Sequence, residues 1–191
     1  MKTVQDFQQW INNGHDFMWL RQPGKSQVEC FALGKPNPSI QGNAILVCPF
    51  ESTTPVAYPI EHQLLVPLDA LPDVSITLPP NSKPALNSTT KAEYTSQVVA
   101  ALSEINLGTL QKVVVAQTHW LDSVQIDAVQ SFQRACVSTD TYTYLAVFEG
   151  ECWIGSSPEL FLKSDYNTSE TVALAGTRLI RDADKPWGDK E

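Results

Sequence analysis

Two ionisable side chains in the second half of the chain have surroundings suited to acid–base chemistry. Lys112 lies in the stretch 110–117, LQKVVVAQ, whose β-branched residues predict a strand over 109–120. Burial lowers the pKa of a lysine, so a lysine inside such a strand could serve as a base near neutral pH. The alternative is a lysine near the strand end whose ammonium group extends to water. The spacing alone favours this alternative.

Glu159 is the second candidate, in the stretch IGSSPELFL. Ser157 is a good helix N-cap and Pro158 suits the first helical position, so Glu159 could simply complement a helix dipole. A third candidate is the stretch ALAGT, residues 173–177, in which three apolar residues are followed by Gly176. That glycine could serve a turn, or it could let a ligand approach the backbone closely.

The order and spacing of these motifs carry more information than any one of them. LQKVVVAQ, IGSSPELFL and VALAGTRLIR follow one another along the chain. From about residue 105 to residue 191 the sequence resembles the chorismate-utilising enzymes. That family includes isochorismate synthase, salicylate synthase, anthranilate synthase component I and aminodeoxychorismate synthase component I. The early strand-rich part is similar to the N-terminal part of menaquinone-pathway isochorismate synthases.

Two positions imply a branch within this family. Members that use water as nucleophile carry lysine at the position of Lys112, whereas anthranilate synthases typically carry glutamine. Aminodeoxychorismate synthases commonly have a lysine at the position of Ala175. The resemblance therefore implies an isochorismate synthase, with a salicylate synthase next. One departure is Gln117, which replaces the arginine usual at the end of the first motif.

The resemblance also implies roles for individual residues. Lys112 would deprotonate water for attack at C2 of chorismate, and Glu159 would protonate the departing C4 hydroxyl. Ala175, Gly176 and Thr177 would lie against the ring or a carboxylate of the substrate. This chemistry needs a neutral lysine and a protonated glutamate, and a helix dipole at Glu159 would oppose the second requirement.

The family also uses Mg²⁺ to hold the substrate carboxylate, with glutamates as ligands. Lys190 and Glu191 are similar to the start of the motif that carries the first ligand. We therefore expect the Mg²⁺ ligands to fall beyond Glu191, in a C-terminal half that this chain lacks. On this interpretation the chain is a truncated isochorismate synthase that is inactive alone.

The elements expected around these motifs indicate an α+β protein with a largely antiparallel sheet and packed helices. Helices are predicted over 3–14, 90–108 and 124–136, and strands over 16–22, 27–34, 43–50 and 109–120. A hairpin with a tight turn at Glu149-Gly150 is predicted over 141–155. The Pro- and Ser-rich stretch 53–90 is predicted to be irregular. We divide the chain into a strand-rich region 1–88 and the first part of the catalytic domain, 89–191.

Composition limits the classes of partner. The net charge is −8 and Lys and Arg form no cluster, which argues against nucleic acid and anionic membranes. The N-terminus lacks the apolar core of a signal peptide, and the four cysteines form no CxxC pair. We expect a cytoplasmic protein with chorismate as its substrate. The alternatives are a salicylate synthase, an anthranilate or aminodeoxychorismate synthase component, and a non-catalytic remnant.

Overall fold

The computed structural model describes residues 3–37, 42–48, 54–72, 88–119, 127–160, 162–165 and 167–172. Contacts within these ranges divide the chain into two compact units. The first unit contains the described residues up to 72 and from 127 onward, and the second contains residues 88–119. The predicted division into a strand-rich region 1–88 and the first part of a catalytic domain, 89–191, stays a prediction.

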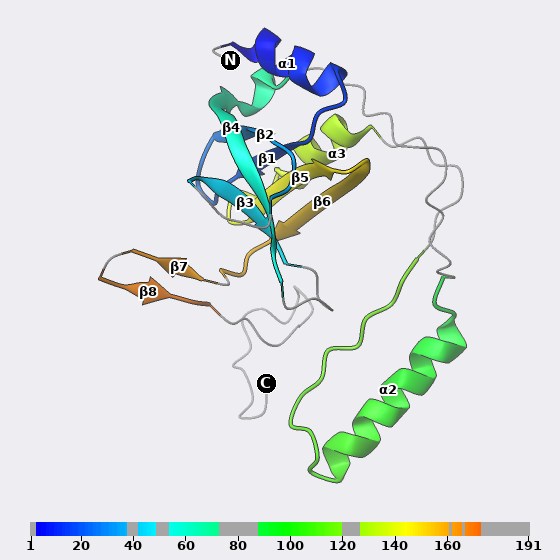
Figure 1. The fold of residues 1–191 in the computed structure, drawn as a ribbon. Helices are drawn as coiled ribbons and strands as arrows, with labels where there is room; N and C mark the ends of the chain where they lie inside the picture. The colour runs from blue at the N-terminus through cyan, green and yellow to red at the C-terminus, as the bar shows by residue number, and fades with distance from the viewer. Residues whose placement is uncertain are drawn as a thin grey trace. The chain divides into compact units, whose positions relative to one another are not determined.

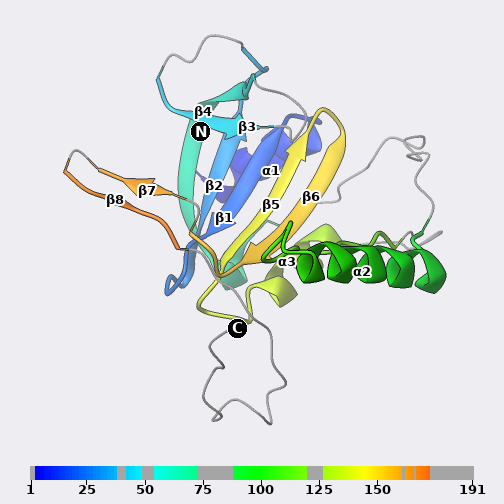
Figure 2. The same cartoon turned by 90° about the horizontal axis from the view of Figure 1, so that it is seen from below.

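One curled antiparallel sheet of six strands forms the body of the first unit (Figures 1 and 2), in the order β3-β4-β2-β1-β5-β6. The strands are β1 (Phe17–Arg21), β2 (Gln27–Leu33), β3 (Ala44–Val47), β4 (Val56–Pro67), β5 (Tyr142–Phe148) and β6 (Glu151–Ser157). The predicted α+β class with a largely antiparallel sheet is confirmed.

The predicted irregular stretch 53–90 is wrong in its first part. Strand β4 occupies Val56–Pro67 and lies between β2 and β3, and a 3-10 turn, η1 (Leu68–Ala70), follows it. Pro59 obscures the strand signal because it cannot donate an amide hydrogen bond. The structure places this proline where β4 changes partner, next to a register shift between Ala32 and Leu33 of β2.

Two helices cover one face of the sheet. Helix α1 (Val4–Asn12) begins with the predicted capping box, in which Thr3 and Asp6 satisfy each other's backbone amides. Helix α3 (Ala128–Ala135) begins at Asp127, whose carboxylate accepts the Gln130 amide at 2.8 Å. The predicted start of this helix, at 124, lies outside the described residues.

The main core fills the space between these helices and the sheet. Trp19 of β1 is its centre, with ring centroids 5.6 Å from Phe17 and 5.7 Å from Phe132. The buried members of this core are Phe7, Ile11, Phe17, Trp19, Val28, Cys30, Ala32, Val66, Ala128, Phe132, Cys136 and Leu145. Period-2 alternation along β1 also buries Arg21 on this face.

The β5–β6 hairpin confirms the predicted tight turn. Glu149 and Gly150 form a two-residue connection, and their φ angles are 50° and 83°. Positive φ at both central residues is the geometry that matches the twist of a two-residue hairpin. Gly150 adopts this conformation without a Cβ clash, which explains the glycine at this position.

The second unit contains one long helix, α2 (Lys91–Asn106), and the extended segment that follows it (Figure 1). The predicted capping box is present, because the Thr90 hydroxyl accepts the Glu93 amide and Glu93 accepts the Thr90 amide. Among the helices that the structure describes, none combines the length and apolar character that a membrane span requires.

The predicted strand over 109–120 is wrong for the residues that the structure describes there. Residues 111–119 have no regular secondary structure. The described part of the second unit contains α2 but no strand, so the described residues there offer this segment no partner for a ladder. Two hydrogen bonds fix its far end: Thr89 N to Thr118 O at 2.7 Å and Thr118 N to Thr89 Oγ1 at 3.0 Å.

Candidate active site

Lys112 lies on the extended segment of the second unit and is exposed to solvent. Its neighbours Val113 and Val114 are exposed as well, Val114 by 80%. In the described structure Lys112 is therefore not buried among valines inside a strand, and its exposure matches the alternative of a lysine whose ammonium group reaches water. The apolar side chains around Lys112 remain available for burial by another surface.

Glu159 follows the end of β6 in the first unit and is also exposed. Its amide donates to the Ser157 hydroxyl at 3.1 Å, so Ser157 stabilises a turn. The predicted helix does not begin here: Ser157 ends β6, and residues 158–160 contain no helix. Because β6 continues to Ser157, hydrogen bonds of the sheet hold the backbone that leads to Glu159.

The structure brings the second and third motifs together. The amide of Val172, the first residue of VALAGTRLIR, donates to the carbonyl of Leu160 at 2.8 Å. A small hairpin joins them, with strands β7 (Lys163–Ser164) and β8 (Ser169–Glu170) (Figure 1). Ala175, Gly176 and Thr177 lie outside the described residues.

This hairpin was not predicted from the sequence, although the turn-forming residues at 165–169 are a signal for it. The Asp165 carboxylate accepts the amides of Asn167 at 2.8 Å and Thr168 at 2.7 Å. These two hydrogen bonds lower the pKa of Asp165 because they stabilise its ionised form. Aspartate followed by asparagine and threonine is a turn signal with this mechanism.

Glu159 directly precedes Leu160, whose carbonyl accepts the hydrogen bond from Val172 at the start of the third motif. Lys112 belongs to the second unit, so the structure describes its surroundings and those of Glu159 separately. Both side chains are accessible to a substrate from solvent. The carboxyl group of Glu159 and the amine of Lys112 are the kinds of group that exchange protons with a bound molecule.

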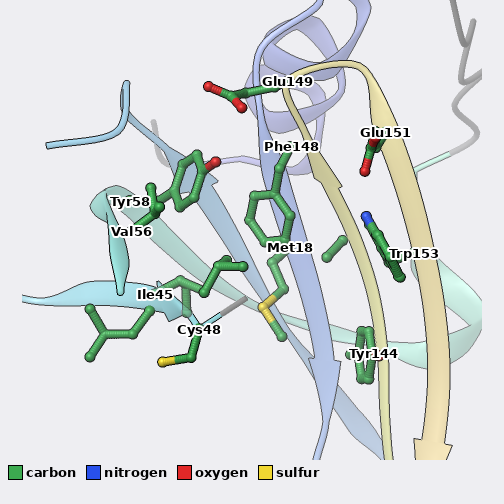
Figure 3. A pocket seen from close by; sticks show the side chains of 13 residues that line it. Met18, Ile45, Cys48, Val56, Tyr58, Tyr144, Phe148, Glu149, Glu151 and Trp153 are labelled. Carbon is green, nitrogen blue, oxygen red and sulfur yellow. The ribbon is translucent and has the colours of Figure 1, made fainter. Parts of the chain in front are cut away.

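A separate groove lies on the face of the sheet that α1 and α3 leave uncovered (Figure 3). Its volume is about 840 Å³. Its lining residues are mostly apolar or aromatic and include Met18, Ile45, Val56, Tyr58, Tyr144, Phe148 and Trp153. The carboxylates of Glu149 and Glu151 line it as well.

The charges beside this groove disfavour an anionic ligand. Burial raises the pKa of Asp16, and the carboxylate of Glu149 raises it further, while the Glu149 amide, which donates to Asp16 Oδ1 at 3.0 Å, opposes the rise. Burial and the carboxylates of Glu149 and Asp16 also raise the pKa of the Tyr58 hydroxyl. Both shifts indicate an environment in which additional negative charge is unfavourable.

No group of three or more His, Cys, Asp and Glu side chains in the described part of the chain could hold a metal ion. The expected Mg²⁺ ligands stay a prediction. Lys190 and Glu191 lie outside the described residues.

Comparison with known proteins identified a matching family. The sequence model of a family described as chorismate binding enzyme matches residues 56–185, which is more than half of the chain. The matched range contains Lys112, Glu159 and Gly176. No curated protein and no solved structure matched the chain.

Proposed function

Since this chain belongs to the chorismate binding enzyme family, we propose that its reaction is the conversion of chorismate to isochorismate. The observation that carries the family assignment is the match over residues 56–185, which includes all three motifs. The hydrogen bond between Val172 N and Leu160 O supports a shared site for the second and third motifs.

The choice of isochorismate synthase within the family rests on residue types at two positions. Lys112 is a residue that can activate water, whereas the glutamine typical of anthranilate synthases cannot take a proton. Ala175 occupies the position where aminodeoxychorismate synthases commonly carry lysine. Both positions favour water as the nucleophile.

The proposed reaction needs one base and one acid. Lys112, in its neutral form, takes a proton from water as the oxygen bonds to C2 of the ring. The ring double bonds shift and the C4–O bond breaks. Glu159, in its protonated form, gives its proton to the departing hydroxyl, which leaves as water. One water molecule is consumed and one is released, so the reaction is an isomerisation.

The backbone at Glu159 supports its proposed role as the acid. A helix N-terminus at Glu159 would favour the ionised carboxylate by about 0.3–1 kcal/mol. Because no helix begins within residues 158–160, that stabilisation is absent there. A dianionic substrate close to this carboxyl group would then favour its protonated form by charge repulsion.

Lys112 acts as a base only in its neutral form, whereas water around an exposed amine stabilises the ammonium form. We propose that the exposed valines beside Lys112 become buried when substrate binds, and that the loss of water around the amine favours the neutral form. The hydrophobic exposure of Val113 and Val114 supports this step. Mg²⁺ dependence is part of the proposal, with ligands that are not among the described residues.

The test uses the protein as its gene encodes it, incubated with chorismate and Mg²⁺, with the product identified by chromatography and mass. We expect isochorismate, and we expect Lys112→Gln and Glu159→Gln each to reduce kcat by at least about 100-fold. Lys91→Gln is the matched control, because Lys91 is an exposed lysine in the first turn of α2.

The product decides between the alternatives. Salicylate with release of pyruvate would replace the proposal by a salicylate synthase. Formation of an amino product that depends on ammonia would indicate the amine-using branch. Unchanged kcat in Lys112→Gln would refute the role of Lys112 as the base.

A further inference from the structure

The groove on the uncovered face of the sheet is hollow because a small residue occupies its middle. Ala146 of β5 pairs with Met18 of β1 on one side and with Trp153 of β6 on the other. Phe148, two residues further along β5, pairs with Glu151. Because side chains alternate along a strand, these five residues line the same groove. Its volume of about 840 Å³ lies within the range of roughly 300–1,000 Å³ typical of small-molecule sites.

Aromatic rings form much of the wall of this groove (Figure 3). The ring centroids of Tyr58 and Phe148 lie 4.7 Å apart, with an angle of 37° between the ring planes. Trp153 is 55% exposed, although it is the largest side chain in the groove. The face of an aromatic ring attracts a cation, because the ring quadrupole places negative potential there. The exposed indole of Trp153 is therefore an available contact for an organic cation.

The charged groups that line the groove are all carboxylates. Glu149 and Glu151 flank the turn of the β5–β6 hairpin, and none of the lining residues that the structure describes is Lys, Arg or His. A third carboxylate, that of Asp16, accepts the Glu149 amide at 3.0 Å beside the groove. Charge complementarity therefore favours a cationic ligand over an anionic one.

Tyr58 contributes an uncharged acceptor close to these carboxylates. Its side chain is 4% exposed, and its hydroxyl has no hydrogen-bond partner among the described residues. The hydroxyl oxygen keeps contact with solvent, unlike Trp19 Nε1, which is enclosed. Figure 3 shows the hydroxyl on the side of the groove where Glu149 lies. Because a phenol oxygen can accept as well as donate, a donor placed here would satisfy this group.

We propose that the groove binds a primary amine with an aromatic body, in the form of its ammonium ion. The ammonium group has three donors, which bond to the carboxylate of Glu149 and to the hydroxyl of Tyr58. Glu151 adds a second negative charge. The aromatic body of the ligand packs against the rings of Trp153 and Phe148.

The experiment is a titration of the full 191-residue chain with 2-phenylethylamine at neutral pH, followed through the ¹H–¹⁵N signal of the Trp153 indole. The signal is assigned by through-bond correlation to the backbone. We expect a saturable shift of this signal and no shift of the Trp19 indole, which is fully buried in the main core. Replacement of the ammonium group by a hydroxyl, in 2-phenylethanol, should weaken binding by at least about tenfold. Phenylacetate should give no saturable shift.

Four variants separate specific binding from general electrostatics. Glu149→Gln keeps the size of the side chain and removes its charge, and it should weaken amine binding by about fivefold to tenfold. Tyr58→Phe removes the hydroxyl alone and should weaken binding by about threefold to fivefold. Glu151→Gln should weaken binding by about threefold, because an exposed carboxylate contributes a modest attraction. Glu170→Gln is the control: Glu170 is exposed in β8 and does not line the groove, so the affinity should not change.

A Trp153 indole signal that does not move with 2-phenylethylamine would overturn the proposal, and this measurement needs no variant to fold. Equal affinity for 2-phenylethanol would overturn the cationic class of ligand. Equal losses of affinity in Glu149→Gln and Glu170→Gln would show general charge attraction and would also overturn the site. Lys112 and Glu159 do not line the groove, so none of these outcomes bears on the proposed function.

Discussion

Substitution of Gly155 by alanine tests the packing of the strand that leads to Glu159. Gly155 lies in β6 opposite Tyr144 of β5, whose ring covers the glycine. A Cβ at position 155 would lie 2.4 Å from Tyr144 Cε1, 2.5 Å from Cζ and 2.6 Å from the hydroxyl oxygen. Real carbon atoms do not approach this closely, so the ring or the strand must move.

The magnitude of the effect follows from what has to move. Tyr144 lines the open groove, so its ring can swing away from β6 without entering the main core. Overpacking costs about 1–3 kcal/mol when the surroundings cannot yield, and the open groove places this case in the lower part of that range. We expect a loss of roughly 1–2 kcal/mol in the free energy of unfolding.

The assay is urea unfolding followed by tryptophan fluorescence, since Trp19 is fully buried in the main core. Gly34→Ala is the matched control: a Cβ there would meet the carboxylate of Glu61 at 2.7 Å, and Glu61 is an exposed side chain that can move freely. We expect less than about 0.5 kcal/mol of change in that variant.

A double mutant makes the test specific for the ring. In a Tyr144→Ala background the obstacle is gone, so Gly155→Ala should then cost nearly nothing. If Gly155→Ala is as stable as Gly34→Ala in the otherwise unchanged chain, or if its effect persists without the Tyr144 ring, the packing argument is refuted.

Three further predictions concern other parts of the chain. Asp16→Asn should become increasingly stabilising relative to the unchanged chain as pH rises from about 3 to 7. The raised pKa of Asp16 stabilises the fold below the unfolded pKa, and that contribution is lost as pH rises through the folded pKa. Urea unfolding at several pH values measures this difference in stability, and a difference that does not change with pH would contradict the prediction. Cys48 is exposed and should react rapidly with a thiol reagent. Burial raises the pKa of Cys30 to about 12, so Cys30 should react only after unfolding. Mass spectrometry of the modified protein measures the two reaction rates, and equal rates would contradict the prediction. Asp127→Ala should reduce stability by about 1 kcal/mol through loss of the α3 N-cap, with Asp140→Ala, an exposed aspartate outside a helix cap, as the control in the same unfolding assay.

Local signals predicted the elements whose stabilising interactions are close in sequence. The capping boxes at Thr3 and Thr90 contain both partners within four residues, and the β5–β6 turn depends on Glu149 and Gly150 alone. The alternation in β1 likewise identifies the buried face. These features follow from the sequence because each is determined by neighbouring residues.

The features that the sequence did not predict depend on partners far along the chain. Strand β4 contains Pro59 and is a strand because β2 and β3 both pair with it. The stretch around Lys112 has strand composition and yet forms no described strand, because composition does not supply a pairing partner. Similarly, Ser157 and Pro158 favour a helix start, but pairing of β5 with β6 continues to Ser157.

The bond between Val172 N and Leu160 O closes the segment between them into a loop whose two ends are fixed. Residues could be inserted or deleted at the β7–β8 tip without moving either end, since the ladder of Lys163–Ser164 with Ser169–Glu170 would absorb the change. The number of residues between Glu159 and the third motif can therefore vary among related sequences, whereas the hydrogen bond that closes the loop cannot be lost. A graft of a foreign peptide at this tip should leave the geometry at its base intact.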